Sequence, residues 1–293
     1  MENREEHAIL MRRATYASVA VALCLIIFKI LAFLVTGSVA LLSSLVDSLL
    51  DCLASILNLF AVRQSLVPAD DEHRFGHGKA EPLAGLGQAA FITGSSIFLV
   101  LESINRIVNP KVVVQGEIGL LVMLFSLVAT IALVTYQSYV ARKTGSVAIK
   151  ADSIHYFSDI ALNTGVIIAL LLTTYVGWEL ADPVIALLIA LYIVSSAWKI
   201  IKQSLDQLMD RELLPEQRQV IIDLLESQTA IAGYHDLRTR TSGTDVFIQL
   251  HLDIDGSISL GQAHAIASEV ESSLRTRFPT ADILIHQDPV DRD

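Results

Sequence analysis

The chain has 293 residues, of which 53% are hydrophobic, and its mean hydropathy is +0.54. This composition excludes an ordinary soluble protein and indicates a membrane protein. The formal net charge of −10 argues against a nucleic-acid-binding protein, because such proteins present basic surfaces to phosphates.

Six segments are long and apolar enough to cross a bilayer as helices. The loops on the side of the N-terminus hold nine of the lysines and arginines near these spans, and the opposite loops hold two, Arg106 and Lys111. The positive-inside rule therefore places both termini of this multi-pass protein in the cytoplasm. The predicted spans cover residues 14–35, 39–62, 84–107, 118–140, 147–174 and 178–201.

The second span carries two aspartates, Asp47 and Asp51, within the stretch TGSVALLSSLVDSLLD. A carboxylate in the membrane core costs roughly 2.5–3.5 kcal/mol on insertion scales, so an intramembrane pair indicates a functional site. Residues i and i+4 share one face of a helix, so both side chains can point toward the same neighbouring helix.

The five letters TGSVA that begin at Thr36 recur 108 residues later, at the start of the fifth span. With this offset, His155 falls on Asp47 and Asp159 falls on Asp51. The two copies start from opposite faces of the membrane, which predicts inverted halves of three helices each, as in many transporters. The four side chains then meet near the midplane, where three carboxylates and one imidazole can coordinate a divalent cation tetrahedrally, as zinc accepts. The alternative is that these groups hydrogen-bond between helices or line a wet crevice.

The loop after the second span, DDEHRFGHGK, contains three candidate metal ligands, Asp70, His73 and His77. The two histidines are four residues apart, but Gly76 and Gly78 predict a loop there and not a helix. The alternative is a solvated polar loop without a ligand.

The tail reads as a small α/β domain. Residues 206–293 hold 16 acidic and 7 basic residues, which fits a domain that handles cations or a solvated acidic surface. Pro215 marks the start of a first helix, and two strands follow it, joined through the turn-rich letters TSGTD. A second helix over roughly 260–277 precedes a final strand, DILIHQDP.

Four histidines and one aspartate of this tail are candidate metal ligands. His251 lies on the polar face of its strand, and His286 and Asp288 share a face because they are two residues apart. Surface histidines without a ligand role are the alternative. The candidates are His235, His251, His264, His286 and Asp288.

Several motifs resemble those of the cation diffusion facilitator family, and the match extends along nearly the whole chain. The motifs are VDSLLD, HYFSD, PADDEHRFGHGKAEPLA, HDLRTRTSG and IHQDP. The resemblance implies a homodimer in the bacterial inner membrane that exports a cytosolic divalent cation in exchange for protons and is not an enzyme. An aspartate at position 47 implies selectivity beyond zinc (Zn2+), including ferrous iron (Fe2+) and cadmium (Cd2+), because oxygen-rich ligation discriminates poorly among these metals. The implied transport site is Asp47, Asp51, His155 and Asp159.

The same resemblance implies further sites. The loop would hold a second, cytosol-facing zinc ion, and the tail a binuclear site bridged by Asp288, with Gln287 as an accessory ligand. Lys79 and Asp210 would form a charge interlock at the dimer junction, the alternative being two unrelated surface charges worth under about 1 kcal/mol. The tail would have a metallochaperone-like α-β-β-α-β fold that dimerises on binding metal.

We therefore expect an α-helical membrane protein with six transmembrane helices and a C-terminal cytosolic α/β domain. Residues 1–207 form the transport domain in this prediction, and residues 208–293 form the metal-binding, regulatory and dimerisation domain.

Two other classes of function compete with transport. An aspartyl intramembrane protease would place its aspartates on different helices, and the sequence contains neither the His-Glu-x-x-His string of zinc proteases nor a P-loop for ATP. A membrane metal sensor would use the tail and transport nothing, but a ligand set at the membrane midplane disfavours it.

Overall fold

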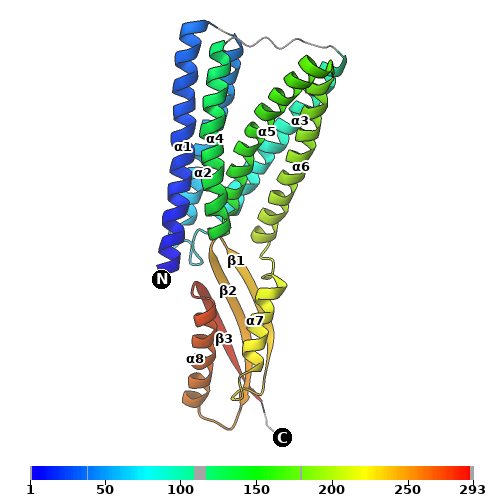
Figure 1. Ribbon diagram of the computed structural model, residues 1–293. Helices are drawn as coiled ribbons and strands as arrows, with labels where there is room; N and C mark the ends of the chain where they lie inside the picture. Colours follow the sequence, from blue (N-terminus) through cyan, green and yellow to red (C-terminus); the bar gives the residue numbers. More distant parts are fainter. Residues whose placement is uncertain (1, 38, 109–116, 179, 291–293) are drawn as a thin grey trace.

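The computed structural model describes residues 2–37, 39–108, 117–178 and 180–290. Six long helices form an elongated bundle, and a small α/β domain extends from one end of it (Figure 1). Lys111, one of the residues used to predict the orientation, lies outside the described residues.

All six predicted membrane spans are confirmed as helices long and apolar enough to cross a bilayer. Several helices continue past the predicted spans, because hydropathy marks the segment inside lipid whereas the helical hydrogen bonds continue into water. In the extension of the first helix, Met11 is fully buried against Val62 and Val140 of its neighbours. The helices are α1 (Glu2–Thr36), α2 (Val39–Ser65), α3 (Ala80–Val108), α4 (Glu117–Thr144), α5 (Val147–Val176) and α6 (Ala181–Leu208).

The bundle consists of two groups of three helices. In one group α1 packs against α2 and α4, and in the other α6 packs against α3 and α5 (Figure 1). The second half of the sequence thus contributes α4 to the group of α1 and α2, and the first half contributes α3 to the group of α5 and α6. The second and fifth helices belong to different groups, so side chains between them lie at the junction of the two groups.

The glycine of the letters TGSVA stands at the end of a helix in both copies. Gly37 follows α1 and Gly145 ends α4, and their positive φ angles of 61° and 73° are conformations that favour glycine. The amide of Gly37 donates to the Phe33 carbonyl at 2.7 Å, and that of Gly145 to the Ala141 carbonyl at 2.9 Å. The first turn lies at the end of the bundle far from the C-terminal domain and the second at the near end, as inverted copies require (Figure 1).

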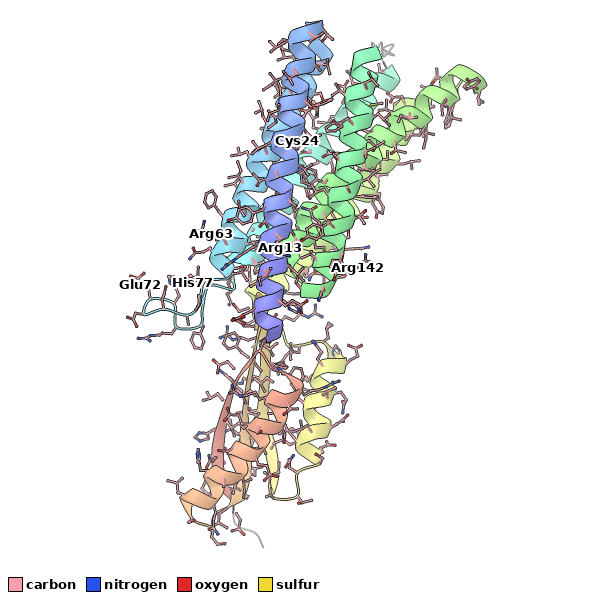
Figure 2. The ribbon with its side chains drawn as sticks, turned by 60° about the vertical axis from the view of Figure 1, so that its left-hand side comes forward. Arg13, Cys24, Arg63, Glu72, His77 and Arg142 are labelled. Atoms are coloured by element: carbon pink, nitrogen blue, oxygen red, sulfur yellow. The ribbon has the colours of Figure 1, made fainter. Side chains whose placement is uncertain are left out.

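Basic side chains mark the end of the bundle that faces the C-terminal domain. Figure 2 shows Arg63 and Arg142 near the ends of their helices on this side, with Arg13 on the adjoining part of α1. This distribution is the one from which the cytoplasmic orientation of the termini was predicted.

The C-terminal domain has the predicted α-β-β-α-β order. Strands β1 and β2 pair antiparallel, and β3 joins β2 in parallel after the crossover helix α8. Pro215 stands in the first turn of α7, where a missing N–H costs nothing, and Ser259 and Gln262 form a capping box at the start of α8. The elements are α7 (Pro215–Glu226), β1 (Gly233–Ser242), β2 (Asp245–Asp255), α8 (Leu260–Arg277) and β3 (Ala281–Val290).

One face of this sheet is buried and the other is open. Ile248, Leu250 and Leu252 of β2 are at most 1% exposed and form the core with both helices. The alternate residues of the strand, among them His251 and Asp253, point to the opposite face. The alternation along β2 therefore places polar residues on a half-exposed surface with the core directly behind it.

Candidate functional site

Asp51 of α2 comes together with His155 and Asp159 of α5 inside the membrane bundle. Ligand atoms of these three residues all lie within 4.8 Å of one another. The Nε2 atom of His155 is 3.0 Å from Oδ1 of Asp51, and His155 is only 6% exposed. Two carboxylates and one imidazole at this spacing supply three of the four ligands of a tetrahedral divalent-metal site.

Aromatic rings hold the His155 imidazole in place. Phe91 of α3 meets it edge-on with ring centroids 5.6 Å apart, and Tyr156 lies on another side at 5.5 Å. The hydroxyl of Tyr156 is in turn 2.8 Å from that of Ser55 on α2. Packing therefore fixes the ring orientation, as a preorganised ligand requires.

Asp47 is not part of this group. It lines a cavity of about 380 Å³ between α2, α3, α5 and α6, together with Glu102 and Asp182. Residues one turn apart on a helix are about 5–6 Å apart at Cβ, so Asp47 and Asp51 share a face without reaching the same point. Asp47 can act as the fourth ligand only when its side chain turns toward the other three.

The loop after α2 brings its three candidate ligands together. Ring nitrogens of His73 and His77 each lie 3.4 Å from an oxygen of Asp70, and the two ring centroids are 4.5 Å apart. Gly76, with a φ of 77°, makes the reversal that returns His77 to Asp70. This loop projects sideways between the bundle and the C-terminal domain (Figure 2).

The electrostatics of the loop favour a cation. The backbone N–H groups of His73 and Glu72 donate to Asp70 Oδ1 at 2.6 and 3.0 Å. The His73 hydrogen bond, ahead of the one from Glu72, holds the pKa of Asp70 below its usual range although burial opposes this. Nδ1 of His77 is buried and has no hydrogen-bond partner among the described residues. An ionised carboxylate beside an imidazole with a free nitrogen fits a metal ligand set.

Asp288 lies at the centre of a cluster on the open face of the sheet. Its carboxylate is 2.7 Å from Nδ1 of His251, 3.1 Å from Nε2 of His235 and 3.2 Å from Nε2 of His286. The hydrogen bond with His251 is the largest cause of a lowered pKa of Asp288, and the other two histidines add to it against a burial effect. A carboxylate shared by three imidazoles can bridge two metal ions.

Strand register explains this convergence. His235 pairs with His251 and His251 with His286, which forms one row of imidazoles across all three strands. In the next row Asp253 pairs with Asp288, and Nε2 of His235 is 3.4 Å from Asp253. Asp253 was not predicted, although it lies two residues after His251 and therefore on the same face.

The structure does not bring two of the predicted tail ligands into this cluster. His264 is exposed on α8 and belongs to none of the metal-compatible groups found among the described residues. Gln287 pairs with Leu252, so its side chain lies on the face of the sheet toward the helices. Only the backbone of Gln287 lies beside the cluster.

Lys79 and Asp210 meet where the bundle joins the C-terminal domain. The ammonium of Lys79 is 3.0 Å from the carboxylate of Asp210, which also accepts from Arg240 of β1 at 3.2 Å. Burial alone would raise the pKa of Asp210, but the hydrogen bonds and charges of Lys79 and Arg240 outweigh it and lower the pKa. The guanidinium of Arg240 also stacks on Phe247, 4.3 Å from the ring centroid.

A buried polar network beside the central site was also not predicted. Asp152 is fully buried on α5 and accepts hydrogen bonds from Ser18 of α1 at 2.8 Å and Gln137 of α4 at 2.6 Å. Gln88 of α3 adds a third at 3.4 Å. One carboxylate thus ties four helices together on the side of the central site nearer the C-terminal domain.

Comparison with known proteins assigns the chain to a family. Residues 15–209 match the family model of the cation efflux transmembrane domain. The chain belongs to the cation efflux family, the cation diffusion facilitators. Residues 213–290 match the cytoplasmic domain of cation efflux proteins.

Several curated relatives are similar to this member of the cation efflux family along nearly their whole length. The cation-efflux pump FieF of Serratia proteamaculans is 48% identical over 284 residues, which cover 97% of this chain and 94% of the relative. FieF of Klebsiella pneumoniae is 47% identical over 285 residues, 97% of this chain and 95% of the relative. The resemblance seen in the motifs is therefore confirmed, and the chain is a multi-pass cation efflux transporter and not an enzyme.

Proposed function

We propose that this cation efflux protein exports zinc from the cytoplasm in exchange for protons, and that it also accepts ferrous iron and cadmium. The observation that carries the proposal is the convergence of Asp51, His155 and Asp159 between α2 and α5. One imidazole with carboxylates suits zinc, and oxygen-rich ligation leaves room for the other two metals. Asp47 completes the transport site in this proposal.

The proposed mechanism is alternating access around this site. The two three-helix groups rock against each other, so that the site opens first to the cytoplasm and then to the outside. The ligands must lose protons before they bind a metal, so an entering cation displaces protons. His155 is the ligand type whose ordinary pKa, about 6.5, lies near cytoplasmic pH, and it returns a proton inward after the metal has left.

The proposed assembly is a homodimer in the inner membrane with both termini in the cytoplasm. Residues 1–207 carry transport, and residues 208–293 bind metal, regulate transport and dimerise. The match to a cytoplasmic-domain model and the basic side chains at that end of the bundle support this arrangement. The ion pair of Lys79 and Asp210 would fix the position of the transmembrane domain relative to the C-terminal domain at the dimer junction.

Zinc is also the resident ion proposed for the two remaining clusters, where it would act as a structural and regulatory cross-link. Asp70, His73 and His77 would hold one ion in the loop. In the tail, Asp288 would bridge two ions with imidazole ligands on either side, and the Gln287 backbone is the candidate to complete the shell, whereas His264 lies away from this cluster. The remaining tail ligands are His235, His251 and His286.

A metal panel in proteoliposomes tests the proposal. Purified protein is reconstituted with a metal reporter and a pH reporter inside the vesicles, and zinc, ferrous iron, cadmium and manganese are added outside in turn. The proposal predicts uptake of zinc, iron and cadmium by the molecules whose cytoplasmic face points out of the vesicle. Each metal should raise the pH inside, because protons leave the vesicle in exchange. Metal uptake without any pH change would contradict proton exchange, and uptake confined to zinc would contradict the broader selectivity.

A further inference from the structure

Lys29 is a charged residue in the apolar C-terminal half of α1, within the letters CLIIFKILAFL. A lysine at this depth in a membrane is costly, and such residues usually serve a function. Its ammonium donates to the hydroxyl of Ser48 at 2.6 Å and to the backbone carbonyl of Ser44 at 3.0 Å, both on α2. The side chain therefore points into the bundle, toward the helix that carries Asp47 and Asp51.

The ammonium lies close to the central carboxylates without occupying them. Ser48 stands between Asp47 and Asp51 in the sequence and is only 3% exposed. Lys29 is hydrogen-bonded to neutral oxygens, yet it interacts electrostatically with Asp51, Asp159 and Asp47. Because Ser48 and His155 are buried here, the charge of Lys29 is screened less than it would be at a fully exposed surface. The arrangement leaves the carboxylate oxygens available to a metal while a fixed positive charge acts on them.

The positive charge of Lys29 acts against the negative charge that draws a cation to these carboxylates. A divalent cation and the ammonium repel each other, so a cation bound at the site is held less tightly than it would be without the lysine. Without the lysine, the same cation would be attracted more strongly and would leave more slowly.

We propose that Lys29 is a built-in counter-charge that weakens the hold of the central site on a divalent cation and speeds its release. The inference rests on the central transport site proposed above. It predicts that removing the charge lowers both KM and kcat for zinc, by about tenfold each, because a tighter site fills at lower concentration and empties more slowly.

The test separates the charge of Lys29 from its hydrogen bonds. Lys29→Gln keeps a donor toward Ser48 without the charge, Lys29→Met removes both, and Lys29→Arg keeps both. Lys150→Met is the control, since Lys150 lies on α5 and bonds Gln203 at 2.9 Å in an exposed position. Initial zinc fluxes in proteoliposomes give KM and kcat, and thermal melting of each detergent-solubilised variant reports its fold.

The charge account predicts lowered KM and kcat for Lys29→Gln and Lys29→Met, with wild-type values for Lys29→Arg and Lys150→Met. Wild-type kinetics or a raised KM in Lys29→Gln would overturn it, as would a Lys29→Gln variant that no longer folds, because the lysine would then be a structural anchor. Asp51→Ala is measured in parallel. If Asp51→Ala transports zinc normally, the proposed central site is wrong. If Asp51→Ala loses transport while Lys29→Gln has wild-type kinetics, the central site stands and only the counter-charge proposal is wrong.

Discussion

His155 and Asp51 are 104 residues apart in the chain, yet their side chains meet at 3.0 Å between α5 and α2. The contact joins one helix from each half of the repeated sequence, since Asp51 follows the first TGSVA turn and His155 follows the second, at opposite ends of the bundle. A ligand pair that bridges the two three-helix groups is placed to respond when the groups move relative to each other.

The proton coupling proposed for His155 predicts a pH dependence of export. Acidifying the outer side should speed outward zinc flux, because protonation of the ligands promotes release of the metal. The protonated, metal-free site then reopens to the cytoplasm. Replacing His155 with Asp keeps four ligands, all of them then carboxylates, and substitutes a group with an ordinary pKa near 3.9 for one near 6.5, so the pH optimum should shift downward. The measurement is zinc flux against external pH between about 5.5 and 8, and an unchanged optimum in His155→Asp would contradict the role of His155.

The cluster on the open sheet face predicts zinc binding by the C-terminal domain alone. Residues 208–293 should fold and dimerise, and zinc should raise their melting temperature because it binds the native state. His251→Ala combined with Asp288→Ala should remove most of that rise. Asp282→Ala is the matched control, a carboxylate on β3 outside the metal-compatible groups. A zinc response that survives the double substitution would place the zinc site elsewhere in the domain.

The lowered pKa of Asp288 predicts how acid acts on this domain without metal. A carboxyl group whose pKa is lower in the folded than in the unfolded state stabilises the fold above its ordinary pKa, near 3.9. That contribution disappears as the pH falls through the lowered folded value. In the presence of a chelator, the melting temperatures of the wild-type and Asp288→Asn domains should therefore differ above about pH 4 and become equal in stronger acid. A difference that persists undiminished at pH 2 would have a cause other than ionised Asp288.

The junction between bundle and C-terminal domain depends on a close backbone contact. A Cβ atom at Gly78 would overlap the backbone carbonyl of Ser242, whereas one at Gly94 in α3 would meet nothing within 4 Å. Gly78→Ala should therefore speed hydrogen exchange around Ser242 and Gly243 by about tenfold or more, while Gly94→Ala leaves exchange there unchanged. Equal exchange in both variants would show that the two domains do not rely on this contact.

Much of the architecture follows from patterns of short range. Six apolar segments predict six spans, and alternation along the tail strands predicts that His251, His286 and Asp288 face the same way. The offset of 108 residues aligns His155 with Asp47 and Asp159 with Asp51 before any contact is known, and so predicts that the second and fifth helices face each other. These inferences need only helix and strand periodicity and one internal repeat.

The remainder depends on how helices rotate and cross. Periodicity puts Asp47 on the same face as Asp51 but does not show that its carboxylate turns into a separate cavity. Nothing near Lys29 or Asp152 in the sequence indicates that their partners come from other helices. His264 was predicted as a ligand from its residue type alone, and only the packing of α8 places it away from the cluster.

The most direct test of the central claim is zinc flux into proteoliposomes for wild type, Asp51→Ala and Asp159→Ala, with Asp282→Ala as the acidic control. All four proteins should fold and dimerise alike, because the substitutions remove ligands and leave the helix contacts in place. The account predicts that flux falls to the protein-free background, a loss of 100-fold or more, in Asp51→Ala and Asp159→Ala and stays at the wild-type rate in Asp282→Ala. Wild-type zinc flux in either of the first two variants would show that the cation does not pass through the site between α2 and α5.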